Sequence, residues 1–185
     1  PTLVTDPNHL DGVDPLAPAF ALNAAKIAAR LTRKPMGAKV AAVLRPCEIR
    51  AFVELVKLKQ GCTDEVILIG MDCLGALQNK DYFQLVEQNA AESTVMFYEH
   101  ALRGKSTETG GVDLAPACKA CEYPVAENAD ILIGLYGMDI DQSLLVQSRT
   151  KAGDHILKQM NLAAADGPRG RQDAIKAIIK QRTQY

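Results

Sequence analysis

The sequence predicts an α/β fold in which helices cross over between the strands of an open, mostly parallel sheet. Three short apolar runs, rich in β-branched residues, are too brief for helices, and they alternate with longer segments whose apolar residues recur at helical spacing. Parallel strands need such crossover connections, so the alternation favours a parallel sheet. With 185 residues, 48% of them hydrophobic, the chain is long enough for one domain with a sizeable core.

The chain begins with a segment that has no regular period. Residues 1–19 hold four prolines, so we expect an irregular lead-in. A helix is predicted over 19–34 because alanine and leucine gather on one side and lysine and arginine on the other, and Pro35 ends it.

Two strand-and-helix pairs follow. The apolar run at 38–44 predicts a strand, and 45–61 predicts a helix that ends at a glycine. The pair recurs as a buried strand at 65–71, a short loop, and a helix over 80–93.

The remaining part of the chain combines a cysteine-bearing loop with a hairpin and two helices. Residues 93–104 fit a strand or a helix equally well, and a loop as long as 105–128 is usually functional or disordered. The other predicted elements are a buried strand at 129–137, a segment at 142–150 that pairs with it as an antiparallel hairpin, and helices at 151–161 and 171–182.

The charge balance and hydropathy argue against two classes of protein. Formal net charge is −1, from 21 basic and 22 acidic residues, which is unlike the basic footprint of a nucleic-acid-binding protein. Apolar runs are far shorter than a membrane span, and the start has no secretion signal pattern, so we expect a cytoplasmic protein. Because residue 1 is proline and not methionine, we also expect that the chain is a piece of something longer.

Two cysteines occupy equivalent places at the ends of predicted strands. Cys47 follows the first strand and falls in the first turn of the next helix, where the helix dipole favours a thiolate. Cys73 follows the second strand in the same way. The carboxyl ends of parallel strands are where ligands bind in open α/β sheets, so both thiols are candidate ligands. A buried cysteine that only fills space is the alternative for each.

Cys118 and Cys121 form a C-x2-C pair in the long loop, a spacing that lets both sulfurs face one metal centre. Together with Cys47 and Cys73 they make a set of four thiolates, which suits either a 4Fe-4S cluster or zinc. Structural zinc sites usually combine two close pairs, so the pattern favours a cluster. A noncatalytic zinc assembly domain and a metal-free α/β binding domain remain the alternatives. Cys62 has no place in this pattern and is interpreted as structural.

Several motifs together resemble one family. They are VLRPCEIRA after a strand, ILIGMDCLGA, ACKACEYPVAENADILIGLYG, and SRTKAG, which is similar to an Arg-Thr-x-x-Gly turn into a helix. In this order and context they resemble the beta-subunit family of coenzyme F420 hydrogenases and dehydrogenases, which includes formate dehydrogenase beta subunits. The resemblance covers residues 38–154. Many members have glutamine where Glu48 stands here.

The resemblance implies an oxidoreductase function. It implies a 4Fe-4S cluster held by Cys47, Cys73, Cys118 and Cys121, a flavin that is usually FAD, and hydride exchange with coenzyme F420 or a similar carrier. Electrons would pass singly to other subunits of a hydrogenase, formate dehydrogenase or similar complex. The family commonly carries a ferredoxin-like module, which this sequence lacks, so a ferredoxin-like module or chain is an implied partner.

Two arginines flank Cys47 and are candidate cofactor-binding residues. Arg45 and Arg50 could steady a cluster or clamp a cofactor phosphate with the fork geometry of a guanidinium. The alternative is that both are ordinary solvated residues on the helix surface.

Overall fold

The computed structural model describes residues 1–20, 22–35, 37–103 and 112–184, without the side chains of 88–93. The described residues form two compact units, which we treat separately. The sheet unit comprises Ala24–Cys73 and Ala120–Tyr185, and the smaller unit comprises Pro1–Asn23 and Leu74–Lys119.

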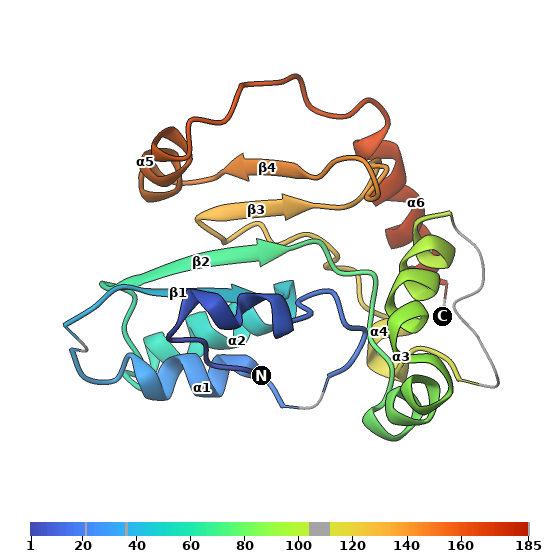
Figure 1. Cartoon of the computed structure of the whole chain (residues 1–185), viewed down its shortest axis with the longest axis horizontal. Helices are drawn as coiled ribbons and strands as arrows, with labels where there is room; N and C mark the ends of the chain where they lie inside the picture. The colour runs from blue at the N-terminus through green and yellow to red at the C-terminus, as the bar shows by residue number, and fades with distance from the viewer. Residues whose placement is uncertain (21, 36, 104–111, 185) are drawn as a thin grey trace. The chain divides into compact units, whose positions relative to one another are not determined.

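The sheet unit is built on four strands: β1 (Val40–Leu44), β2 (Val66–Met71), β3 (Ile131–Gly134) and β4 (Leu145–Ser148). They lie side by side in the order β1-β2-β3-β4 (Figure 1). The first three are parallel, and β4 pairs with β3 in the antiparallel direction. This arrangement confirms the predicted α/β fold with an open, mostly parallel sheet.

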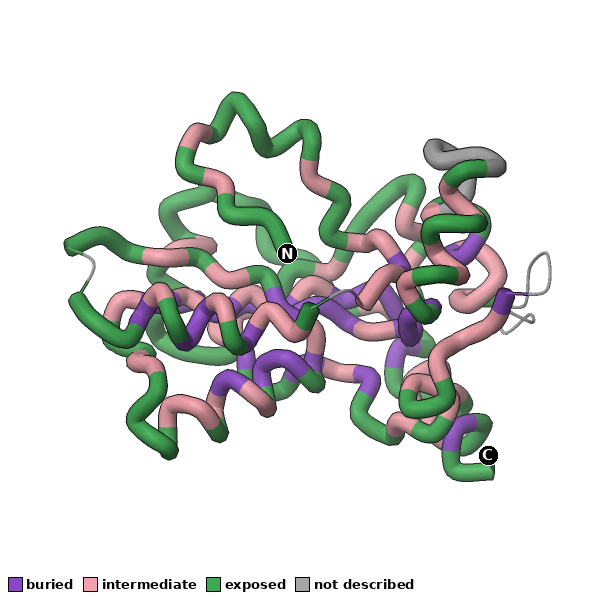
Figure 2. Tube along the Cα trace, turned by 90° about the horizontal axis from the view of Figure 1, so that it is seen from below, coloured by how far each residue is buried: buried purple, intermediate pink, exposed green. Residues whose placement is uncertain are grey.

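Four helices belong to the sheet unit: α1 (Ala24–Leu31), α2 (Pro46–Lys57), α5 (Lys151–Gln159) and α6 (Arg171–Thr183). Helices α1 and α2 pack on each other and on the first two strands, while α5 contacts β4. The core is formed where α1, α2, the three parallel strands and the segment before β3 meet, by Ala25, Ala28, Ala29, Leu44, Ile49, Phe52, Val66, Leu68, Ala126, Ala129 and Leu132. Figure 2 shows buried positions alternating with exposed ones along the chain, as expected of amphipathic elements.

The first helix of the sheet unit is shorter than its pattern predicts. The separation of apolar from basic residues over 19–34 predicts a helix that starts at residue 19, but α1 begins at Ala24. There the backbone N–H of Ala24 donates to Oε1 of Glu48 at 2.9 Å, so a side chain from α2 satisfies the open helix end. Ala19 instead forms a parallel bridge with Leu77.

The smaller unit contains η1 (Pro7–Gly12), α3 (Asn79–Leu102) and α4 (Pro116–Lys119). The 3-10 helix η1 lies within the predicted irregular lead-in, where Asp6 caps it by accepting from the N–H of Asn8. Helix α3 runs through most of 93–104, which decides that ambiguous stretch in favour of helix. Residue 104 and the first part of the predicted loop, 105–111, lie outside the described residues.

Within the described segments, no helix is both long enough and apolar enough to cross a bilayer.

Candidate functional site

The carboxyl ends of the parallel strands carry the two cysteines predicted there. Cys47 is the second residue of α2, which begins two residues after β1, and it is exposed. Cys73 follows the end of β2 by two residues and is half-buried. Since β1 and β2 are parallel neighbours (Figure 1), the residues that follow them lie at the same edge of the sheet.

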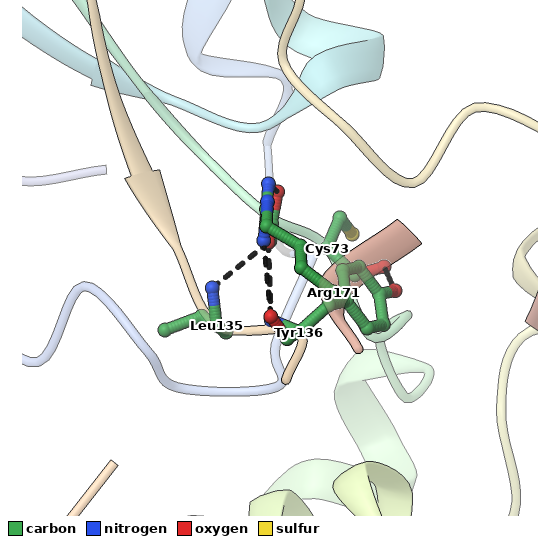
Figure 3. Close-up of polar contacts among 5 residues, drawn as sticks. Cys73, Leu135, Tyr136 and Arg171 are labelled. Carbon is green, nitrogen blue, oxygen red and sulfur yellow. Dashed lines mark hydrogen bonds and ion pairs between the residues drawn. The ribbon is translucent and has the colours of Figure 1, made fainter. Parts of the chain in front are cut away.

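Asp72 fixes the loop in which Cys73 lies. Its carboxylate is 1% exposed and accepts from the backbone N–H of Leu135 at 2.8 Å and of Tyr136 at 3.1 Å, both just after β3. Arg171 donates to the same carboxylate with both terminal nitrogens, at 2.5 and 3.0 Å (Figure 3). This buried, bidentate ion pair joins the end of β2 to the first residue of α6.

The loop after β2 and the segment at 121–124 lie against each other. The backbone N–H of Cys73 donates to the carbonyl of Pro124 at 2.8 Å, and the hydroxyl of Tyr136 donates to the carbonyl of Cys73 at 2.8 Å. Arg182, near the end of α6, donates to the carbonyl of Cys121 at 3.2 Å and to that of Cys73 at 3.3 Å. The fold thus brings the main chains of Cys73 and Cys121 together.

The same segment also lies beside α2. The guanidinium of Arg50, one turn after Cys47, is stacked over the ring of Tyr123 with 4.0 Å between its carbon and the ring centroid. Arg45 is the N-cap residue of α2, and its backbone N–H donates to Oε2 of Glu48 at 3.0 Å. Stacking uses the face of a guanidinium and leaves its N–H groups in the plane.

Cys118 belongs to the smaller unit. It lies in the short helix α4, where its backbone N–H donates to the carbonyl of Ala115 at 2.8 Å. The neighbouring Lys119 forms an ion pair with Asp113. Cys62 lies away from the predicted set in the loop before β2, where its backbone N–H donates to Thr32.

None of the five cysteines forms a disulfide, so all of them are thiols. Four thiolates are the donor set that a 4Fe-4S cluster takes, and in this respect the residues fit the group that the resemblance implies. Among the residues that the structure describes, no three histidine, cysteine, aspartate or glutamate side chains are grouped so as to hold a metal ion. A cluster places each thiolate on a different iron, so its cysteines need not approach one another as closely as ligands of one ion.

Three charged residues that organise this edge of the sheet were not predicted from the sequence: Asp72, Arg171 and Arg182. The two arginines fall in a helix whose other charged residues are exposed, so their burial has no local signal. Asp72 had a weak signal, because it directly follows a buried strand and precedes a candidate ligand.

The comparisons with known proteins agree with the motifs. A family model that describes the C terminus of the coenzyme F420 hydrogenase/dehydrogenase beta subunit matches residues 37–165, more than half of the chain. A curated relative, the F420-dependent formate dehydrogenase 1 subunit beta of Methanococcus maripaludis, is 26% identical over 141 residues. That match covers 65% of this chain and 36% of the relative.

A solved structure also has a similar fold. It is that of the F420-reducing [NiFe] hydrogenase complex from Methanosarcina barkeri, with a TM-score of 0.51 and 20% identity. The match covers 79% of this chain and 58% of the chain in that structure, so this chain spans only part of either relative. On the extent of the family match, the chain belongs to the coenzyme F420 hydrogenase/dehydrogenase beta-subunit family, of which it contains the C-terminal region.

Proposed function

We propose that this chain is an electron-transfer domain of an oxidoreductase complex and that Cys47, Cys73, Cys118 and Cys121 hold a 4Fe-4S cluster. The observation that carries the proposal is the meeting of the main chains of Cys73 and Cys121, 48 residues apart in sequence, at the sheet edge near which Cys47 also lies. Cys118 is included in the proposed ligand set because of its C-x2-C spacing with Cys121.

The chain's own residues would hold the loops that carry the cluster ligands. The ion pair of Asp72 with Arg171 holds the start of the loop that contains Cys73. The hydrogen bond from the N–H of Cys73 to the carbonyl of Pro124 holds that loop against the segment at 121–124. When bound, a 4Fe-4S cluster accepts and releases single electrons. Rigid placement of its ligands limits the structural change that accompanies each electron transfer.

We extend the proposal to a flavin, which we take to be FAD, and to coenzyme F420 or a similar deazaflavin as the hydride carrier. A flavin accepts two electrons with a hydride and can release them one at a time, so it links a hydride carrier to a one-electron cluster. The proposed partners are other subunits of an F420-type hydrogenase or formate dehydrogenase and a ferredoxin-like module or chain. A cytoplasmic location is part of this proposal.

The cluster is tested by anaerobic reconstitution with iron and sulfide, followed by iron and zinc analysis and a visible spectrum. We expect about four irons per chain, a brown colour and a broad visible absorption in the original protein. Cys73→Ala should lose the cluster, because it removes one of the four ligands.

Cys62→Ala is the matched control, since Cys62 lies outside the proposed ligand set, and it should load as the original protein does. Full iron loading of Cys73→Ala would contradict the proposal. A colourless protein with one zinc per chain would instead identify a structural zinc domain.

Arg45 and Arg50 are proposed to bind the flavin pyrophosphate from the N-terminal turns of α2. We expect Arg45→Gln and Arg50→Gln each to weaken FAD binding by roughly tenfold, as loss of a charge-assisted contact should, measured by quenching of flavin fluorescence. Arg30→Gln, in α1, removes an exposed arginine outside the proposed site and should have no effect. Unchanged affinity in both α2 variants would remove the phosphate role.

A further inference from the structure

Helix α6 carries two buried arginines whose surroundings differ. Arg171, at its start, is 8% exposed and forms a bidentate ion pair with Asp72, so its charge is compensated. Arg182, at its end, is 5% exposed, although the residues next to it in the last turn are exposed. Among the described residues, two positive charges are therefore withdrawn from water, and a carboxylate neutralises only that of Arg171.

The partners of Arg182 are backbone carbonyls and not carboxylates. Its two terminal nitrogens donate to the carbonyl oxygens of Cys121 and Cys73, at 3.2 and 3.3 Å. None of the ion pairs formed among the described residues includes Arg182. Carbonyl dipoles satisfy the N–H groups of a guanidinium but do not cancel its charge.

A buried charge without a counter-charge is costly, so such groups are normally found beside an opposite charge. Both residues that Arg182 holds are cysteines from the proposed ligand set. Bound to a cluster, the thiolates of these same two residues would supply a negative charge close to the carbonyls that the guanidinium contacts.

We propose that Arg182 is a positioning residue that holds the two cysteine loops in register and compensates the negative charge of a cluster bound at Cys73 and Cys121. This inference rests on the proposed cluster. Reduction of the cluster adds one electron and no proton, so it makes the site more negative by one charge. A fixed buried cation stabilises the reduced form more than the oxidised form, and Arg182 therefore raises the reduction potential.

The two roles of Arg182 can be separated with two substitutions. Arg182→Gln keeps an N–H donor but removes the charge, while Arg182→Lys keeps the charge but lacks the planar fork that spans two carbonyls. Lys180→Gln is the matched control, because it removes an exposed positive charge from the same turn of α6. Circular dichroism establishes that each variant is folded before it is loaded.

The experiment is a mediated redox titration of the reconstituted protein, with the reduced cluster followed by electron paramagnetic resonance. At the midpoint potential of the original protein, we expect Arg182→Gln to have about a tenfold lower ratio of reduced to oxidised cluster, which is about 59 mV for a one-electron couple. Arg182→Lys and Lys180→Gln should keep the original potential to within roughly threefold in that ratio.

The positioning role of Arg182 is measured by the rate at which a chelator removes iron from the loaded protein. Outer groups that orient metal ligands are typically worth tenfold or more in metal affinity, so both Arg182 variants should lose iron about tenfold faster than the original protein. Lys180→Gln should not. If Arg182→Gln does not fold, Arg182→Lys decides alone: an unchanged potential with faster iron loss supports the inference, and any other result overturns it.

If Arg182→Gln has the same reduction potential and the same rate of iron loss as the original protein, the inference is overturned, while the proposed cluster is unaffected. An equal shift of potential in Lys180→Gln would also overturn it, because the effect would then not depend on the buried position. A wild-type protein that takes up no iron would reject the proposed cluster itself, and this inference with it.

Discussion

Gly153 lies in the first turn of α5, where the main chain passes very close to the segment before β3. A Cβ at this position would lie 2.1 Å from the carbonyl oxygen of Asp130, which no side chain tolerates. Thr150, the N-cap residue, accepts from the N–H of Gly153 at 3.3 Å and donates to Asp130 at 2.6 Å. Asp130 also accepts from the N–H of Leu68 in β2. The Arg-Thr-x-x-Gly turn therefore ties α5 to the sheet.

Gly153→Ala should destabilise the protein, because its methyl group can be accommodated only if the backbone moves. We expect a loss of about 2 kcal/mol in the free energy of unfolding, measured by urea denaturation. Gly167→Ala is the control, since nothing lies within 4 Å of the added Cβ and the position is exposed. It should change stability by less than about 0.5 kcal/mol, and an equal effect in both variants would contradict the close approach.

Sequence reasoning placed Cys47 and Cys73 just after strands, where the structure has them, but missed the residues that hold the Cys73 loop. The two positions could be predicted because strand ends are visible in a local pattern. Arg182 was missed because its partner Cys73 is 109 residues away, and Asp72 because Arg171 is 99 residues away. No local period reports a contact over such a separation.

At the scale of elements, α6 depends on charges for its place on the sheet. Its hydrophobic residues do not form a strong apolar face, and the buried positions within it are Arg171 and Arg182. Each reaches a loop that follows a strand or carries a cysteine. The ends of α6 are thus anchored by polar contacts where most helices use an apolar stripe.

Asp72→Asn should release the start of α6, because it leaves the guanidinium of Arg171 buried without a counter-charge. We expect a cost of about 3–5 kcal/mol in the free energy of unfolding by urea denaturation. Adding Arg171→Met to Asp72→Asn should recover part of this loss, since the unpaired charge is then removed.

Glu54→Gln is the control for the loss of a carboxylate from an ion pair. Its partner is Lys57, and both side chains are 64% exposed, so the pair contributes less than about 0.5 kcal/mol. A cost for Asp72→Asn as small as that of Glu54→Gln would show that the buried pair does not hold α6.

The type of most elements could be predicted, whereas some of their boundaries could not. The parallel strands have apolar runs that are too short for helices, and their alternation with helices predicted the parallel pairing that the sheet has. At the late start of α1, the backbone N–H of Ala24 donates a hydrogen bond to the carboxylate of the distant Glu48. The apolar period alone does not report this contact and therefore predicted a helix that starts too early. Most of the stretch at 93–104 is helix, as a continuation of α3, which ends at Leu102.

At the scale of the whole molecule, neither of the two compact units is one continuous stretch of the sequence. The sheet unit is made of two stretches, and the smaller unit contains the residues between β2 and β3 along with the first 23 residues. Three of the four proposed ligands, Cys47, Cys73 and Cys121, lie in the sheet unit. The curated relative and the matched chain in the solved structure are both longer than this chain, which spans only part of each.

The hydrogen bonds from Arg182 to the carbonyls of Cys73 and Cys121 have a consequence for biosynthesis. A ribosome makes Cys47, Cys73 and Cys121 well before it makes α6, so nascent protein exposes these thiols before their loops can be fastened. Iron captured at that stage would meet proposed ligands that are not yet spaced for it. The proposed cluster would therefore be inserted after translation of α6.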